Sequence, residues 1–253
     1  MADFATGPSL RWLFSQFTGN NLRIGVDLFL MLAGALSLGR EWTIKEFLGK
    51  PIIAYSIEAA LNSRLFDEVM VSTDDEEIAK IAKEAGANVP FMRSEKTSND
   101  YATTADVLLE VLEKYREMGQ EFAYTCCIYP TAPFVTEEKL QKAFAMIKEK
   151  EAWQLTPVVA YSFPPQRCVV IREGEIEMLH PEHRNTRSQD LEPYYHDCGQ
   201  FYFYDTNELV KGKGVIVENV IPMVLPELEV QDIDNEVDWK IAEMKYKLMQ
   251  SEK

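Results

Sequence analysis

The sequence is poor in basic residues, and it lacks a long uninterrupted apolar run. Lysine and arginine together number 26 against 41 acidic residues, which gives a net charge of −15 and a pI near 4.7. This balance argues against broad nucleic-acid binding, because phosphate contacts require a concentrated basic surface. The apolar stretch at 28–39 is shorter than the roughly 18 residues of a membrane-spanning helix, and no clear signal-peptide cleavage site follows it. We expect a buried strand and a turn there, in a protein that does not enter the membrane.

Metal-binding cysteine patterns are also missing. The four cysteines show neither CxxC nor Cys/His spacing, and they are Cys126, Cys127, Cys168 and Cys198. We therefore expect free, mostly buried thiols of the kind found in the reducing cytoplasm. Internal repeats, low-complexity tracts and Gly/Ser linkers are absent as well, which favours one domain over residues 1–253.

Strand and helix patterns alternate along most of the chain. Short β-branched runs at 68–73, 124–129 and 154–161 indicate buried strands, and segments such as 52–65 and 104–118 carry apolar residues at helical spacing. This order predicts an α/β fold with a mostly parallel sheet and helices on both faces.

The alternation stops at about 165–205. The segment CVVIREGEIEML suggests a hairpin centred on Glu173-Gly174, so we expect a small β-rich lobe inserted there. Strand character returns near VIPMVLPELEV. Asn235 then caps a closing helix whose apolar residues are Val237, Ile241, Met244 and Leu248.

Paired carboxylates precede that closing helix. Asp232 and Asp234 are two residues apart, and in an extended segment such side chains point the same way. Two carboxylates suit Mg²⁺, which commonly binds one or two of them together with substrate phosphates. The alternative is that Asp234 caps the helix and Asp232 is solvated. Asp74 and Asp75 could likewise bind a metal or cap a helix, and we expect a helix cap.

Two polar segments are candidates for substrate contacts. In RSQDLEPYYHDCGQFYFY, Arg187 could hold a carboxylate through two hydrogen bonds, and aromatic residues could line a sugar ring. An exposed loop followed by an edge strand is the alternative. RSEKTSND (93–100) places hydrogen-bond donors after a strand, where α/β proteins bind ligands. The aromatic candidates are Tyr194, Tyr195 and Phe201.

Six motifs in order resemble the cytidylyltransferases that activate nine-carbon acidic sugars. The resemblance covers about Ile44 to Leu248, and RSEKTSND, YPTAPF and YHDCGQFY favour the branch that acts on pseudaminic acid. The alternative sugar is N-acetylneuraminic acid. The motifs lie at 44–63, 71–87, 93–110, 129–135, 187–204 and 229–243.

The resemblance implies a Rossmann-like nucleotide-diphospho-sugar transferase fold. The implied reaction joins CTP and a nine-carbon 2-keto sugar acid to give a CMP-sugar and pyrophosphate, with Mg²⁺ as cofactor. By family position Asp232 and Asp234 hold the metal and are catalytic. The small lobe is implied to form a homodimer and to cover the sugar site. The residues implied to bind substrate are Arg93, which contacts the nucleotide, and Tyr129, Thr131, Arg187 and Gln200.

Residues 1–43 depart from this family. The family's phosphate-binding loop, of the type PARGGSKRIP, is replaced by the stretch LMLAGALSLGREWTIKEF at 30–47. Only Ser37, Arg40 and Lys45 remain as weak candidates for phosphate contacts, although a strand at 28–32 would preserve the fold. Three explanations stay open: a shifted reading frame or start, a divergent enzyme with a reduced clamp, and a descendant that binds sugar or protein without catalysis.

Overall fold

The computed structural model describes residues 28–32, 39–99 and 101–251. Its main sheet has the strand order β11-β6-β10-β5-β1-β4, and β9 pairs with β6 beside β10. The strands β4, β1, β5, β6 and β11 share one direction, whereas β9 and β10 run against it. The predicted mostly parallel sheet is thus confirmed. The strands are β1 (Leu28–Leu32), β4 (Glu68–Ser72), β5 (Tyr124–Ile128), β6 (Gln154–Ala160), β9 (Tyr195–Asp197), β10 (Phe201–Asp205) and β11 (Val220–Val224).

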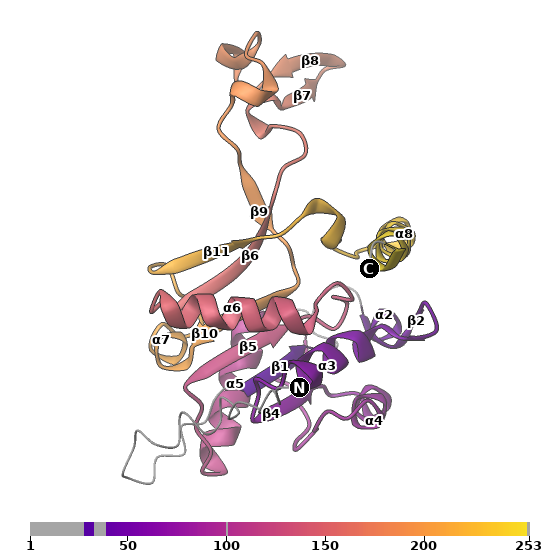
Figure 1. Cartoon of the computed structure of the whole chain (residues 1–253), viewed down its shortest axis with the longest axis vertical. Helices are drawn as coiled ribbons and strands as arrows, with labels where there is room; N and C mark the ends of the chain where they lie inside the picture. The colour runs from indigo at the N-terminus through magenta and orange to yellow at the C-terminus, as the bar shows by residue number, and fades with distance from the viewer. Residues whose placement is uncertain (1–27, 33–38, 100, 252–253) are drawn as a thin grey trace, which may run out of the picture.

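Helices cover both faces of this sheet (Figure 1). Successive strand residues point to opposite faces, so Val69 and Val71 pack against α3 (Ile52–Ser63), α4 (Glu76–Glu84) and α6 (Glu137–Glu149). Met70 points the other way, toward α5 (Thr104–Glu117) and α7 (Thr206–Lys211). The strand β4 is therefore buried on both faces, as its continuous apolar run indicated.

The apolar stretch that the sequence placed at 28–39 supplies the strand β1, which lies between β4 and β5. Of the described helices, none is both long and apolar enough to cross a membrane. The cysteines Cys126, Cys127 and Cys198 are buried free thiols, and Cys168 is half-buried.

Side chains cap the N-termini of α4, α5 and α6. The Asp75 carboxylate accepts hydrogen bonds from the backbone amides of Glu77 and Ile78, at 2.8 and 3.0 Å, which confirms it as the cap of α4. Thr103 and Thr136 cap α5 and α6 in the same way.

A hairpin arm leaves the sheet after β6 and returns at β9 (Figure 1). It holds β7 (Val169–Arg172), β8 (Glu175–Met178) and the 3₁₀ turns η1 (Pro165–Arg167), η2 (Pro181–His183) and η3 (Ser188–Asp190). Glu173 and Gly174 both have positive φ, at 53° and 85°, so the predicted hairpin turn is confirmed. β9 and β10 lie in the main sheet, so the projecting arm comprises residues 161–194 rather than 165–205.

An aromatic cluster attaches the closing helix α8 (Glu236–Ser251) to the rest of the domain. The Phe47 ring makes edge contacts with the rings of Tyr55, Trp239 and Tyr246. Phe47 follows α2 (Gly39–Ile44) in the two-residue strand β2 (Glu46–Phe47), which pairs with β3 (Lys50–Pro51). The helix therefore buries Trp239 and Ala242, whereas the apolar residues expected from spacing are exposed: Val237, Ile241, Met244 and Leu248.

Candidate functional site

The strands β1, β4 and β5 end at one edge of the sheet, which we call the carboxyl edge. Leu32 of β1 is in register with Ser72 of β4, and Met31 is in register with Ile128 of β5. The antiparallel strand β10 begins at the same edge, because Phe201 pairs with Ile128. Open α/β sheets bind ligands at this edge, so the residues that follow these strands are the first to consider.

Asp232 and Asp234 lie in the connection between η4 (Glu227–Glu229) and α8, rather than at the end of a strand. Ile233 between them is fully buried in the aromatic cluster, so it anchors the segment while both carboxylates remain exposed. A Cβ atom at Gly199, which has φ +60°, would lie 3.4 Å from the Asp232 Oδ1 atom. The turn that leads into β10 therefore passes directly against Asp232, and this brings the pair to the carboxyl edge.

The capping alternative for Asp234 is wrong. The Asn235 side-chain oxygen accepts hydrogen bonds from the amides of Val237 and Asp238, at 2.8 and 3.1 Å, so Asn235 caps α8 as expected. The backbone amide of Asp234 instead donates to the Asp238 carboxylate at 3.1 Å. The Asp234 carboxylate is thus not needed to begin the helix.

Negative charge is concentrated around Asp232. Partial burial raises the pKa of the Asp232 carboxyl, and the nearby carboxylate of Asp234 raises it further, with smaller effects from Asp238 and Asp197. A bound cation would relieve this repulsion. Within the described part of the chain, no three His, Cys, Asp or Glu residues form a metal cage. Two carboxylates fit Mg²⁺, which takes its remaining ligands from water and substrate phosphates.

Arg93 is a buried cation on the β4 side of the same edge. Its backbone amide donates to the Thr73 carbonyl at 2.9 Å, and its Nη2 atom donates to the Ser72 carbonyl at 2.5 Å. Burial lowers the pKa of the Arg93 guanidinium, whereas the charges of Asp74 and Glu110 raise it. Neighbouring strands are about 4.8 Å apart. Arg93 near β4 and Asp232 near β10 therefore lie on opposite sides of the ends of β1 and β5.

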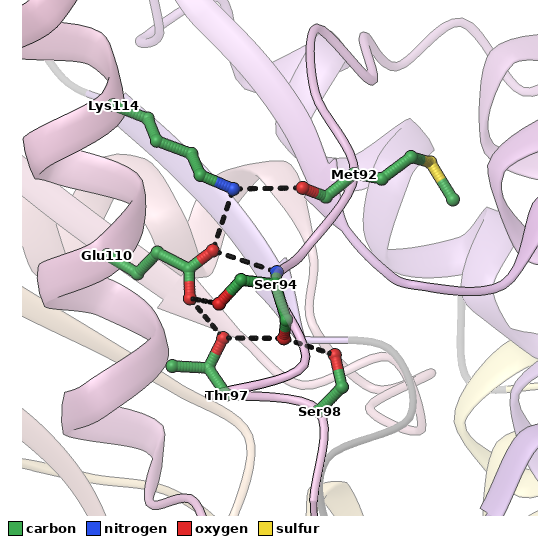
Figure 2. A network of polar contacts seen from close by, with 6 residues as sticks. All are labelled: Met92, Ser94, Thr97, Ser98, Glu110 and Lys114. Carbon is green, nitrogen blue, oxygen red and sulfur yellow. Dashed lines mark hydrogen bonds and ion pairs between the residues drawn. The ribbon is translucent and has the colours of Figure 1, made fainter.

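The loop after Arg93 is held by one carboxylate from α5 (Figure 2). Glu110 accepts hydrogen bonds from the Ser94 amide at 3.0 Å, the Ser94 hydroxyl at 2.7 Å and the Thr97 hydroxyl. It also pairs with Lys114 at 2.7 Å. Burial alone would raise the pKa of the Glu110 carboxyl, but the hydrogen bonds from Lys114, Thr97 and Ser94 outweigh it and lower the pKa to about 2.

This lowered pKa predicts an acid-dependent part of the stability. Because the folded-state pKa lies below the ordinary value of 4.5, the ionised Glu110 carboxylate stabilises the fold above that pH. The contribution, up to about 3 kcal/mol, should be lost as the pH falls toward 2. Urea unfolding at several pH values should show the free-energy gap between the unaltered chain and Glu110→Gln closing on acidification. A gap that stays constant down to roughly pH 3 would contradict this assignment.

Tyr129 begins a chain of hydroxyl contacts across the edge. Its amide donates to the Gln200 carbonyl at 2.8 Å, and its hydroxyl lies 3.2 Å from the Thr104 hydroxyl. Its ring is 5.6 Å from that of Tyr202, whose hydroxyl donates to Asp197 at 2.6 Å. Burial raises the pKa of Tyr129, which keeps its phenol neutral.

Gln200 and Thr131 lie near Tyr129. The Gln200 side chain is buried, and its Nε2 atom donates to the Glu229 carbonyl at 2.7 Å. Its Oε1 atom has no hydrogen-bond partner within the residues that the structure describes. Thr131 follows Tyr129 by two residues and is half-buried. Gln200 directly follows Gly199, which lies against Asp232, and so links Tyr129 to the acidic segment.

Other sequence candidates do not join this group. Arg187 lies on the projecting arm and pairs with Asp190 through two bonds of 2.7 and 3.0 Å. Tyr194 and Tyr195 are half-exposed where the arm meets β9. Phe201 is fully buried in the core, so its expected place beside a sugar ring is wrong.

Of the three weak candidates for phosphate contacts, Lys45 has a side chain that the structure describes. Lys45 pairs with Glu236 at 2.7 Å, and its ammonium lies 4.2 and 4.4 Å from the ring centres of Trp42 and Trp239. Ser37 lies outside the described residues. Arg40 belongs to α2, but its side chain also lies outside the described part.

Tyr202 and Glu110 are site residues that sequence reasoning missed. Tyr202 was hidden in the aromatic run FYFY, although strand alternation separates it from Phe201 and Phe203. Glu110 ends the motif at 93–110, but no role was expected for it, because it resembles any charged residue on an amphipathic helix.

Comparison with known proteins identifies the family. The family model described as cytidylyltransferase matches residues 42–247. Pseudaminic acid cytidylyltransferase of Campylobacter jejuni subsp. jejuni is 37% identical over 206 residues, covering 81% of this chain and 89% of the relative. CMP-N,N'-diacetyllegionaminic acid synthase of Legionella pneumophila subsp. pneumophila is 31% identical over 211 residues, covering 80% and 88%.

A solved structure shows the same fold. CMP:2-keto-3-deoxy-manno-octonic acid synthetase in complex with CTP aligns with a TM-score of 0.64 at 16% identity, covering 89% of this chain and 99% of that one. The fold, together with the match to the cytidylyltransferase family model and its relatives, thus defines a nucleotidyltransferase of the nucleotide-sugar type. The chain belongs to the cytidylyltransferase family.

Proposed function

We propose that this chain transfers CMP from CTP to a nine-carbon acidic sugar, pseudaminic acid. The observation that carries the proposal is the pair Asp232 and Asp234 at the carboxyl edge of a cytidylyltransferase fold. The relatives named for pseudaminic acid support the choice of sugar. In the reaction the anomeric hydroxyl oxygen bonds to the α-phosphorus of CTP and its proton passes to solvent, while the bond from the α-phosphorus to the bridging oxygen of the β-phosphate breaks and pyrophosphate leaves.

The residues of the chain have separate roles in this proposal. Asp232 and Asp234 would hold Mg²⁺, which when bound neutralises charge that develops on the phosphates. Arg93 contacts the nucleotide from the β4 side. Tyr129 and Gln200 orient the sugar with hydrogen bonds, and their burial excludes water from the reacting atoms. Thr131 contributes a further hydroxyl at the same place.

We also propose that the protein forms a homodimer through its arm. The hairpin β7–β8 exposes a group of apolar side chains that a second copy could cover. Arg187 would then act on the partner's sugar rather than at the edge of its own sheet. The exposed apolar residues are Val169, Ile171, Ile176 and Leu179.

The choice of sugar is tested by initial rates of pyrophosphate release from CTP and Mg²⁺ with pseudaminic acid and with N-acetylneuraminic acid. We expect pseudaminic acid to give the higher kcat/KM, at least about tenfold, since a site that hydrogen-bonds one set of substituents rejects analogues lacking them. Equal or faster turnover of N-acetylneuraminic acid would contradict the choice of pseudaminic acid as the preferred substrate.

A sugar-binding descendant without catalysis is the second candidate. It is favoured by Lys45, whose charge is already paired with Glu236, and by the missing cationic loop at 30–47. Calorimetry with CTP and Mg²⁺, and separately with the sugar acid, distinguishes the two candidates. Sugar binding without nucleotide binding would favour the binding protein. Micromolar CTP binding would argue against the non-catalytic binding protein.

A further inference from the structure

Helix α5 contacts the chain on both sides of Arg93. Lys114 donates to the carbonyl of Met92, the residue before Arg93, at 2.9 Å. Glu110, one turn earlier on the helix, accepts from the amide of Ser94, the residue after Arg93, at 3.0 Å. Figure 2 shows the two side chains reaching the two peptides while they also pair with each other. The backbone of Arg93 is thus fixed from both directions.

The loop that follows Arg93 depends on the same carboxylate. Thr97 is 2% exposed and donates its hydroxyl to Glu110. The Ser98 hydroxyl in turn donates to the Ser94 carbonyl at 2.8 Å. The Glu110 carboxylate accepts from the Ser94 amide, the Ser94 hydroxyl, the Thr97 hydroxyl and Lys114. A glutamine could not accept all four, because its amide offers one acceptor oxygen and a donor nitrogen.

We infer that Glu110, paired with Lys114, is a positioning residue that sets nucleotide affinity by fixing Arg93. This role rests on the proposed function, because it assumes that Arg93 contacts CTP. Glu110 itself touches no substrate. It acts by holding Ser94 and Thr97, while its partner Lys114 holds the Met92 carbonyl, so that the Arg93 guanidinium stays against the end of β4 instead of moving with a loose loop. Glu110 lies 16 residues beyond Ser94 and 13 residues beyond Thr97, so its hydrogen bonds tie the loop to the helix.

The first test uses Glu110→Gln, with Glu113→Gln as its matched control. Glu113 lies on the same helix, and its partner Arg116 is on the exposed face. We expect Glu110→Gln to weaken CTP binding in calorimetry about tenfold and to raise KM for CTP with kcat nearly unchanged. Hydrogen exchange at residues 94–98 should speed up in this variant alone. Thr97→Val, which removes one donor at the same size, provides a milder variant if Glu110→Gln unfolds.

The second test is a cycle with Arg93→Met. If Glu110 acts through Arg93, adding Glu110→Gln to Arg93→Met should weaken CTP binding no further, whereas independent effects would multiply. Multiplied effects, or normal CTP binding by Glu110→Gln, would overturn the role of Glu110 while the proposed function stands. Absence of CTP binding by the unaltered chain would overturn the proposed function and this role with it. Faster exchange at 94–98 in Glu110→Gln would in that case still show that Glu110 holds the loop.

Discussion

Asp232→Asn and Asp234→Asn should each lower kcat/KM for CTP by about 10²- to 10³-fold, comparable to the loss of one preorganised electrostatic contact in other enzymes. An amide keeps the size of the carboxylate but removes the charge that a divalent cation needs. Both side chains are exposed beside the fully buried Ile233, so neither contributes much packing. The melting temperature should therefore change little, and steady-state kinetics at limiting Mg²⁺ measures the loss.

Asp205→Asn is the matched control for these variants. Asp205 caps α7 at the end of β10 that lies opposite the carboxyl edge, and Asn caps a helix about as well as Asp. We expect normal activity and normal stability from it. Near-normal turnover in both Asp232→Asn and Asp234→Asn at limiting Mg²⁺ would remove the pair from the catalytic site.

Ile233→Ala should cost about 2–5 kcal/mol of the free energy of unfolding, since it opens a cavity in a core site with no exposed surface. It should also lower kcat/KM at least about tenfold at temperatures where the protein is fully folded, because a small displacement of reacting groups is costly. The reason is that Ile233 anchors the segment that carries both carboxylates. Chemical unfolding and steady-state kinetics on the same preparation measure the two effects.

Two further variants separate packing from positioning. Ile233→Val should cost only about 0.5–1.5 kcal/mol and keep most activity. Ile147→Ala removes an equally buried side chain from the end of α6. It should destabilise the protein like Ile233→Ala but leave kcat/KM unchanged in the folded protein. If Ile233→Ala behaves like Ile147→Ala, the buried anchor does not hold the acidic pair.

Local features of the fold were predictable because single segments encode them. The run EVMVS forms β4 since β-branched residues suit a strand that is buried on both faces. Asn235 and Asp75 begin their helices as expected because a side-chain cap acts within three residues. The turn at Glu173-Gly174 is similarly local.

Features that depend on tertiary contacts were not predictable in this way. α8 turns Trp239 inward because the rings of Phe47 and Trp42 pack against it, so the regularly spaced residues such as Ile241 face outward. β10 enters the middle of the sheet rather than the arm because it pairs with both β5 and β6. Such pairing partners are far apart in the sequence, so periodicity carries no information about them.

The residues of the candidate site were likewise predictable only in part. Motif position brought Asp232 and Arg93 into consideration, and the structure places both at the carboxyl edge. The resemblance also suggested Arg187, but one chain alone keeps it on the arm, paired with Asp190. The role of Glu110 in holding the loop was not predictable, because its partners Ser94 and Thr97 approach it only after folding.

The most direct test of the central claim is phosphorus NMR of the unaltered chain with CTP, Mg²⁺ and pseudaminic acid. We predict that the three CTP resonances disappear while one phosphodiester resonance of a CMP-sugar and one resonance of pyrophosphate grow, the latter with twice the intensity because its two phosphorus atoms are equivalent. The same reaction without the sugar should leave CTP intact. Unchanged CTP in the presence of folded protein and sugar, or its conversion to CDP and inorganic phosphate, would contradict the assignment of CMP transfer to this chain.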